Sequence, residues 1–184
     1  MPETMLCTDE ELYHRIQRSD GQALKLLFQK YYTSLCRFAY LYTKSVHNAE
    51  EAVSDVFLNL WLRRDAIQIH TSLKAYLFTA VKNQSLNYLR RDSYAMDDLD
   101  AIHTGAIASD LQADCLVVST EAKNHIESLL NLLPAKRQMI FRMNRIDGLS
   151  YKEIAEILSI SVHTVQNQMT AAIKFLSEKH PRRK

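Results

Sequence analysis

The side chains best suited to chemistry in this sequence are amides and cations near its C-terminus. Gln166 and Asn167 carry amides that can pair bidentately with adenine, and Lys174 can reach a phosphate. Between residues 136 and 184 there are ten Lys or Arg and four Asp or Glu. Such an excess is expected of a surface that meets phosphates, and equally of a solvated helix face. The fold must decide between these two interpretations.

The elements expected around these amides are two helices joined by a short turn. Ser150 with Glu153 forms a capping box that predicts the start of the first helix. A connection over 159–161 leads to a last helix over 162–177. The buried stripe of that helix is expected to be Val162, Val165, Met169, Ala172 and Leu176, with His163, Asn167, Thr170 and Lys174 opposite. This pattern predicts a helix-turn-helix in which the small Ala155 lets the helices cross closely; a helical hairpin with no DNA role is the alternative.

Helical periodicity covers most of the remaining sequence. The expected helices span residues 8–19, 21–43, 46–63, 72–91, 120–132 and 134–148. Thr8 with Glu11 predicts a capping box for the first of them, Pro134 suits the first turn of the last, and Gly148 ends it. Because the chain also has only three Gly and three Pro, we predict an all-α protein.

The helix over 46–63 is apolar on more than one face. Val53, Val56, Phe57 and Leu60 share the face expected to be buried. Asp55, Leu58 and Leu62 project to the opposite side, where an isolated small bundle would carry polar groups. We interpret this second face as a docking surface, with coverage by another helix of the same domain as the alternative.

The helix over 72–91 is expected to present a polar, cationic face to solvent. The residues expected inward are Leu73, Leu77, Ala80, Val81, Gln84 and Tyr88, and those outward are Ala75, Thr79, Lys82, Asn83 and Arg90. A short segment of mixed polarity, 65–71, precedes this helix. That segment could be merely a connector.

An acidic segment divides the chain. Residues 93–115 contain five Asp and no Lys or Arg. We therefore expect two small helical domains, 1–92 and 119–184, joined by an acidic flexible linker over 93–118.

Little in the sequence favours an enzyme. The seven His are scattered, the three Cys are far apart in no metal-ligand spacing, and no Gly-rich phosphate loop occurs. We predict no catalytic residues, no metal and no cofactor. The sequence has no charged-then-apolar leader and no apolar run of about 18 residues, so we expect a cytoplasmic protein.

Two separate sets of motifs resemble parts of one known family. Residues 154–165 (IAEILSISVHTV), preceded by LPAKRQ at 133–138, resemble region 4, the C-terminal domain of RNA polymerase sigma factors. Residues 49–61 (AEEAVSDVFLNLW) resemble the polymerase-binding helix of sigma region 2, and motifs within 73–91 resemble its promoter-contacting helix. The absence of any recognisable region 1 or region 3 domain points to the extracytoplasmic function (ECF) subfamily.

The resemblance implies contacts with core RNA polymerase and with promoter DNA. Docking on the clamp helices of the β′ subunit would involve Asp55, Leu58, Trp61 and Leu62. Capture of a base flipped from the −10 element, and contacts beside it, would involve Ile67, Gln68, Ile69, His70, Lys82, Asn83, Arg90 and Arg91. Reading of the −35 element would involve Ser161, His163, Thr164, Gln166, Asn167 and Lys174. Which loop residue touches the flipped base stays open.

The family resemblance also implies further partners. These are the β flap of the polymerase and an anti-sigma factor, while the free chain is expected to be a monomer. The sequence departs from many helix-turn-helix motifs at Ser159, where Gly is common. Because the face around His163 and Gln166 is mostly neutral, we expect weak DNA binding by the second domain alone, with polymerase supplying most of the avidity.

One further class of DNA-binding protein remains open at the level of sequence. A transcriptional regulator could bind DNA through the same C-terminal motif and use its N-terminal half to dimerise or to sense a ligand. It would bind DNA without polymerase and would carry an apolar ligand pocket.

Overall fold

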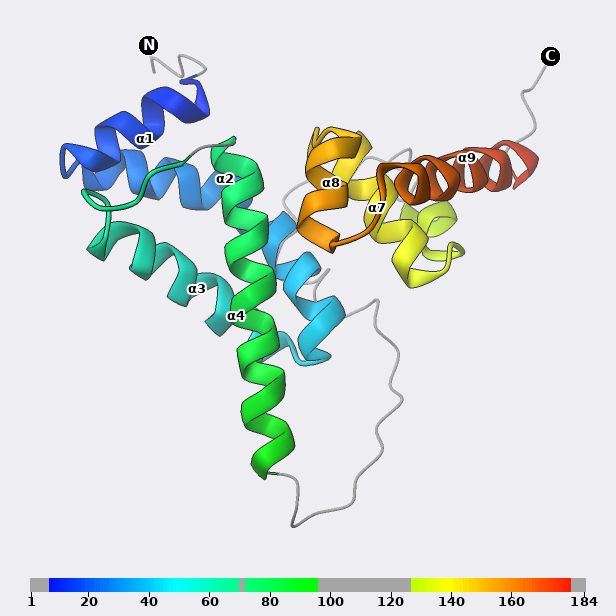
Figure 1. Cartoon of the computed structure of the whole chain (residues 1–184), viewed down its shortest axis with the longest axis horizontal. Helices are drawn as coiled ribbons and strands as arrows, with labels where there is room; N and C mark the ends of the chain where they lie inside the picture. The colour runs from blue at the N-terminus through cyan, green and yellow to red at the C-terminus, as the bar shows by residue number, and fades with distance from the viewer. Residues whose placement is uncertain (1–6, 70–71, 96–126, 180–184) are drawn as a thin grey trace. The chain divides into compact units, whose positions relative to one another are not determined.

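The computed structural model describes residues 7–69, 72–95 and 127–179, with side chains described throughout except at 91–95. The chain divides into two compact units, which span residues 1–102 and 103–184. The described residues of both units are helical and include no strand (Figure 1), which confirms the predicted all-α class with two helical domains. Most of the predicted linker lies outside the described residues.

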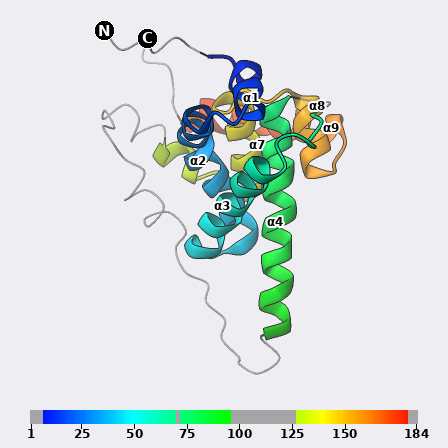
Figure 2. The ribbon, with the colours of Figure 1, turned by 90° about the vertical axis from the view of Figure 1, so that its left-hand side faces the viewer.

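The described part of the first unit is a helical bundle. Its helices are α1 (Asp9–Gln17), α2 (Gly21–Thr43), α3 (Val46–Leu62) and α4 (Leu73–Ala95). Helix α2 packs against α1, α3 and α4, and α3 also packs along α4 (Figures 1 and 2). Helix α4 continues four residues past its predicted end and extends beyond the ends of α2 and α3 in both views.

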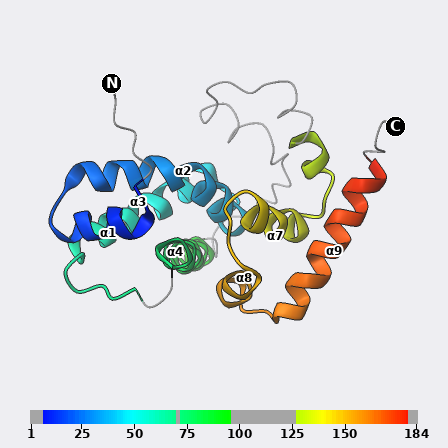
Figure 3. The same cartoon turned by 90° about the horizontal axis from the view of Figure 1, so that it is seen from above.

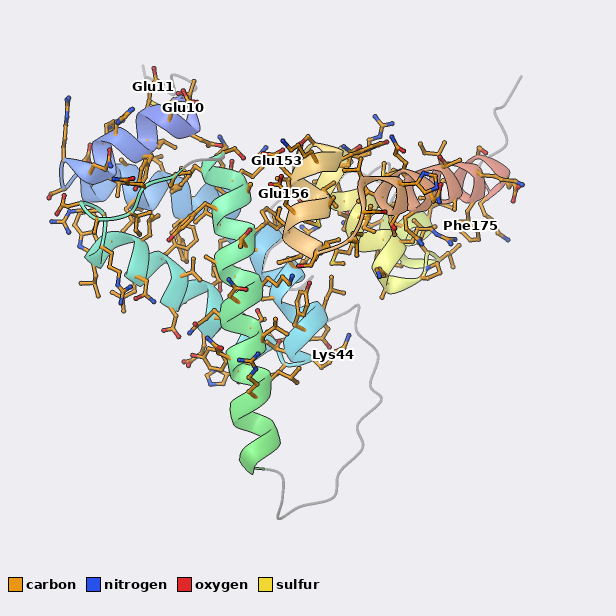
Figure 4. The ribbon with its side chains drawn as sticks, in the orientation of Figure 1. Glu10, Glu11, Lys44, Glu153, Glu156 and Phe175 are labelled. Atoms are coloured by element: carbon orange, nitrogen blue, oxygen red, sulfur yellow. The ribbon has the colours of Figure 1, made fainter. Side chains whose placement is uncertain are left out.

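Side-chain caps fix where these helices begin. Thr8 and Glu11 form the predicted capping box, with the Thr8 N–H donating to the Glu11 carboxylate at 2.8 Å (Figure 4 labels Glu11). The Asp20 carboxylate accepts two backbone N–H groups at the start of α2, and Ser45 Oγ accepts one at the start of α3. Lys44, also labelled in Figure 4, ends α2 in the left-handed conformation with φ of 54°.

The buried face of α4 is wider than its periodicity predicts. Leu73, Leu77 and Val81 are buried as expected. Ala75 was expected outward but is buried, and Phe78, absent from the predicted inward set, is fully buried with its ring 5.1 Å from that of Phe38. The physical reason is that α4 contacts α1, α2 and α3 at once, so more than one stripe of the helix is covered.

The described part of the second unit is a smaller helical cluster. A helix over 127–131 is followed by α7 (Ala135–Arg145), α8 (Tyr151–Leu158) and α9 (Val162–Lys179). Helix α9 packs against both α7 and α8, and α8 leads into α9 through a short turn (Figure 3). Leu130, Leu133 and Ala172 form a buried cluster against which Phe141, Phe175 and Leu176 pack.

Short sequence patterns predicted where α8 and α9 begin, but not every detail of the second unit's helices. Ser150 and Glu153 form the predicted capping box, which Figure 4 locates at the start of α8 by the label on Glu153. Val162 was expected in the buried stripe but is 40% exposed, because it is the first residue of α9 and lies at the edge of the packed face. Helix α7 ends at Arg145, ahead of the predicted end at Gly148, which has a positive φ of 68°.

Candidate nucleic-acid and protein interfaces

The outer face of α3 is apolar at two positions. Leu58 is 55% exposed and Leu62 is 64% exposed. Exposed leucines one helical turn apart are the pattern expected of a surface that another protein covers. For these two residues the described part of the bundle offers no covering helix, which favours the docking interpretation.

Asp55 does not share that outward face. Its Oδ2 accepts a hydrogen bond from Gln84 Nε2 at 2.8 Å and another from the Tyr88 hydroxyl at 2.9 Å. Both donors lie on α4, so the prediction that Asp55 projects away from the bundle is wrong. The alternative, coverage by a helix of the same domain, holds for this residue. We call Asp55, Gln84 and Tyr88 the α3–α4 latch.

The latch also sets the chemistry of Tyr88. Burial, then the hydrogen bond and negative charge of Asp55, raise the pKa of Tyr88 to about 12. The phenol therefore stays protonated and remains a donor to the carboxylate over the whole physiological range. Since Glu51 Oε2 also lies 3.3 Å from this hydroxyl, α3 presents two acidic groups to one tyrosine of α4.

Trp61 is held by a residue absent from the predicted set. The Arg64 guanidinium lies 4.8 Å from the centre of the Trp61 ring, and Arg64 Nη1 donates to the Trp61 carbonyl at 2.8 Å. Arg64 Nε also donates to Ser19 Oγ at 3.1 Å, in the turn between α1 and α2. Spacing of three residues at a helix end is the sequence signal that could have found the Arg64–Trp61 pair.

The loop after α3 alternates in exposure. Ile67 and Ile69 are half-buried, whereas Gln68 is exposed. The Ile67 carbonyl accepts a hydrogen bond from the hydroxyl of Tyr13, on α1, at 2.8 Å. His70, also predicted to touch DNA, lies outside the described residues. Gln68 is therefore the predicted loop residue that the described structure leaves most accessible.

Helix α4 carries a polar stripe. Among the predicted −10 residues Asn83 and Arg90 are exposed and Lys82 is half-buried, while the side chain of Arg91 is not described. Asn87 is exposed too, four residues after Asn83 and three before Arg90, so these three lie on one face. Sequence reasoning missed Asn87, although this spacing could have identified it.

Helix α9 presents most of the predicted −35 residues together. His163, Gln166, Asn167 and Lys174 are all exposed, at spacings that put them along one side of the helix, opposite the buried Val165, Met169 and Ala172.

The remaining pair of −35 candidates has a structural role at the start of α9. Ser161 Oγ accepts the Thr164 backbone N–H at 3.0 Å and lies 2.8 Å from the Thr164 hydroxyl. These two residues therefore cap α9, and their hydroxyls are hydrogen-bonded to each other.

Within the described ranges, the side chains of His, Cys, Asp and Glu nowhere gather in groups of three or more that could hold a metal ion. Across the same ranges, no helix has the length and apolar character needed to span a membrane.

Comparison with known proteins identifies both units. Residues 27–94 match the family model of sigma-70 region 2, and residues 123–176 match that of sigma-70, region 4. The chain is 26% identical to the ECF RNA polymerase sigma-E factor of Escherichia coli K12, with 94% of each chain covered. It is 24% identical to the ECF RNA polymerase sigma factor SigW of Bacillus subtilis, covering 84% of this chain and 87% of SigW.

Solved structures agree on the fold. The sigma factor RpoE of Bartonella quintana, in complex with the anti-sigma factor NepR, superposes with a TM-score of 0.55 at 21% identity, covering 86% of this chain and 98% of that one. CnrH, in complex with the cytosolic domain of CnrY, gives 0.54 at 19% identity, with 93% and 96% covered. The two motif sets fall inside the matched regions in the expected order. The chain therefore belongs to the sigma-70 family of RNA polymerase sigma factors, in its ECF subfamily.

Proposed function

We propose that this sigma factor directs promoter-specific initiation through two separate DNA contacts. The first unit recognises and melts the −10 element, and the second unit reads the −35 element in the major groove. The observation that carries the proposal is the sidedness of α9, whose polar side chains are exposed along one face while the opposite face is buried. A recognition helix needs this arrangement, because one face holds the fold and the other meets the base edges.

The −35 contact is proposed for the exposed face of α9. The amides of Gln166 and Asn167 can each donate to and accept from adenine in the major groove, and His163 lies one turn before Asn167. Lys174, two turns further along α9, would bind a phosphate and set the register of the helix without reading sequence. Ser161 and Thr164 lie at the N-terminal end of the helix, where base or phosphate contacts would compete with the cap that they form.

The −10 contact is proposed for the loop after α3 and the polar stripe of α4. Extruding a base from the duplex costs a few kcal/mol, which a pocket must offset with stacking and hydrogen bonds. Gln68 supplies an exposed amide, Ile67 and Ile69 supply apolar flanks, and His70 completes the set. Lys82, Asn83, Arg90 and Arg91 would follow the adjoining strand, with Asn87 added on the same face as Asn83.

The polymerase contact is proposed for the outer face of α3. Leu58 and Leu62 would be buried against the clamp helices of β′, with Trp61 beside them. Asp55 would contribute through Oδ1, because its Oδ2 accepts both hydrogen bonds from α4. The second unit would rest on the β flap, which would hold α9 over the −35 element.

Other partners follow from this role. RpoE and CnrH were each solved with a second protein bound, an anti-sigma factor in the case of RpoE. We infer that an anti-sigma factor also regulates this chain, and that the chain is a monomer when free. It would work in the cytoplasm with polymerase, and it would catalyse no reaction itself and need no cofactor.

The test is transcription in vitro with purified core polymerase that lacks any sigma factor. The protein is added to core and to a genomic template library, and the 5′ ends of the RNA are sequenced. We expect new start sites that share −10 and −35 elements upstream. Association with core without specific starts would overturn promoter recognition, and DNA binding as a dimer that ignores core would favour the regulator instead.

A further inference from the structure

We propose that helix α1 positions the base-capturing loop, with Tyr13 and Ser19 as positioning residues for −10 recognition. The inference rests on the proposed function, because it assigns a role to residues that act through the loop. Helix α1 ends at Gln17, ahead of residue 27 where the match to sigma-70 region 2 begins. The matched region therefore does not include this helix.

Tyr13 contacts the loop directly. Its ring is buried in the first unit and its hydroxyl donates to the Ile67 carbonyl at 2.8 Å, across 54 positions of sequence. The neighbouring backbone of the loop is fixed from its other side, since the N–H groups of Ala66 and Ile67 both donate to the Arg63 carbonyl. The peptide unit immediately before Gln68 is therefore held at its oxygen by α1.

The chemistry of Tyr13 suits a permanent donor. Burial, and then the nearby Tyr76 hydroxyl of α4, raise the pKa of the Tyr13 phenol. Burial thus favours the protonated phenol, which is the form that donates to the Ile67 carbonyl. The Ile67 carbonyl can only accept, so the hydrogen bond from the Tyr13 hydroxyl requires no change of protonation when DNA binds.

A second contact from the same segment holds the start of the loop. Ser19 lies in the turn after α1, and its hydroxyl accepts from Arg64 Nε at 3.1 Å. Arg64 is also bonded to the Trp61 carbonyl, so this contact ties the end of α3 to the turn. Tyr13 thus anchors Ile67 within the loop, and Ser19 anchors Arg64 just before it.

These two anchors would preorganise the loop after α3 for the base that it captures. A loop that must order itself when it receives a base loses conformational entropy at that step, and this weakens capture. With Ile67 fixed, Gln68 and Ile69 start from a defined position. Loosening either anchor is expected to weaken capture of the base while leaving the exposed leucines of α3 and the polar face of α9 unchanged.

The test measures whether Tyr13 acts through the captured base. Holoenzyme is assembled from core and full-length protein, either wild type or Tyr13→Phe. Its affinity is measured for a single-stranded −10 oligonucleotide of the non-template strand, taken from a promoter mapped by the transcription assay. The oligonucleotide is then made abasic at each −10 position in turn. The position at which removal of the base costs wild type the most affinity marks the captured base.

We expect Tyr13→Phe to bind the intact oligonucleotide about 3- to 10-fold more weakly, the effect of one hydrogen bond. It should bind the oligonucleotide that is abasic at the captured position as well as wild type does. The matched control is Tyr42→Phe, which removes a half-buried tyrosine hydroxyl from α2 in the same unit, where the Tyr42 ring packs on Phe38. That control should leave the base dependence unchanged.

A second variant guards against effects on folding. Ser19 has a positive φ of 65°, so Ser19→Gly removes the hydroxyl while relieving the backbone. It should reduce the base-dependent affinity, with no loss of thermal stability.

Two results would overturn the positioning role. In the first, Tyr13→Phe loses the same affinity for the intact oligonucleotide as for the one that is abasic at the captured position. In the second, both variants lose as much affinity as wild type does when the captured base is removed. A wild-type holoenzyme that distinguishes no abasic position would overturn base capture itself.

Discussion

The two units carry their proposed contact residues in different ways. In the first unit some of these residues are held by other parts of the bundle: Asp55 accepts from α4, Trp61 lies under Arg64, and the Ile67 carbonyl accepts from Tyr13, while Leu58 and Leu62 are exposed. In the second unit the exposed side chains of α9 stand on the free side of a helix whose other side forms the core. Stability and recognition are therefore joined at Asp55, Trp61 and Ile67 in the first unit and separable along the exposed face of α9 in the second.

The difference comes from how many neighbours each helix has. Helix α4 packs against α1, α2 and α3, so polar groups on α3 and α4 meet one another inside the domain. Helix α9 packs against α7 and α8 and keeps a polar face in solvent. Substitutions test this difference, because those in the first unit should affect folding and binding together at the bonded residues, whereas those on the exposed face of α9 should affect binding alone.

The largest effect on stability is expected from Asp55→Ala. Removing the carboxylate leaves the Gln84 amide without its α3 acceptor and leaves the Tyr88 hydroxyl with the longer contact to Glu51 in place of its 2.9 Å bond. The free energy of unfolding of the first unit should therefore fall by about 2–3 kcal/mol. Trp61, the single Trp of the chain, lies in that unit and reports its unfolding in urea by fluorescence.

Leu58→Ala is the matched control on the same helix. Because the Leu58 side chain is 55% exposed, its loss should change the free energy of unfolding by about 0.5 kcal/mol at most, while weakening the affinity for core polymerase in a titration. If Asp55→Ala instead kept full stability and lost only polymerase affinity, Asp55 would be an outward contact and the latch would have no energetic role.

A smaller change, in DNA preference alone, is expected from Asn167→Ala. The variant should lose about 2 kcal/mol of discrimination at one position of the −35 element, the worth of one bidentate amide–adenine pair. Its thermal unfolding should match wild type, because the side chain is exposed and lies on the face of α9 away from the core. Competition binding of holoenzyme to promoters with single changes in the −35 element measures the discrimination.

Gln168→Ala supplies the comparison for Asn167. The Gln168 amide is half-buried and accepts from Arg137 Nε at 3.2 Å, so this substitution should alter stability and not base preference. A fall in melting temperature for Asn167→Ala equal to that of Gln168→Ala would contradict the separation of stability from recognition in the second unit.

The same contrast explains what could be predicted from the sequence. Helix starts at Thr8 and Ser150 were predictable because a capping box is a local pattern, and the stripe of Val165, Met169 and Ala172 was predictable because α9 has one buried face.

The predictions from sequence failed at residues whose partners lie far away along the chain. The helical periodicity of 46–63 placed Asp55 outward because a local pattern contains no information about the two donors on α4, which lie 29 and 33 positions away in sequence. The periodicity of 72–91 missed Phe78 because a helix with three neighbours buries more than one stripe. The Tyr13 contact, 54 positions from its partner, has no local signal at all.

Each unit also contains a non-glycine residue with a strained, left-handed backbone at the end of a helix. Ser159 ends α8 in the left-handed conformation with φ of 56°, where a side chain costs energy that glycine does not. Ser159→Gly should raise the free energy of unfolding of the second unit by about 0.5–1 kcal/mol, less than the full cost because glycine also adds entropy to the unfolded chain. Amide hydrogen exchange in α8 and α9 measures this change.

Lys44→Gly makes the equivalent change in the first unit, at φ of 54°. Each substitution should stabilise its own unit and leave the −35 preference unaltered, since neither touches the exposed face of α9. A loss of stability in Ser159→Gly alone would mean that the Ser159 side chain contributes more than its strained backbone costs. The turn between α8 and α9 would then be held by side-chain contacts, as the proposed contact residues of the first unit are. The two units would then differ only in how their binding faces are built.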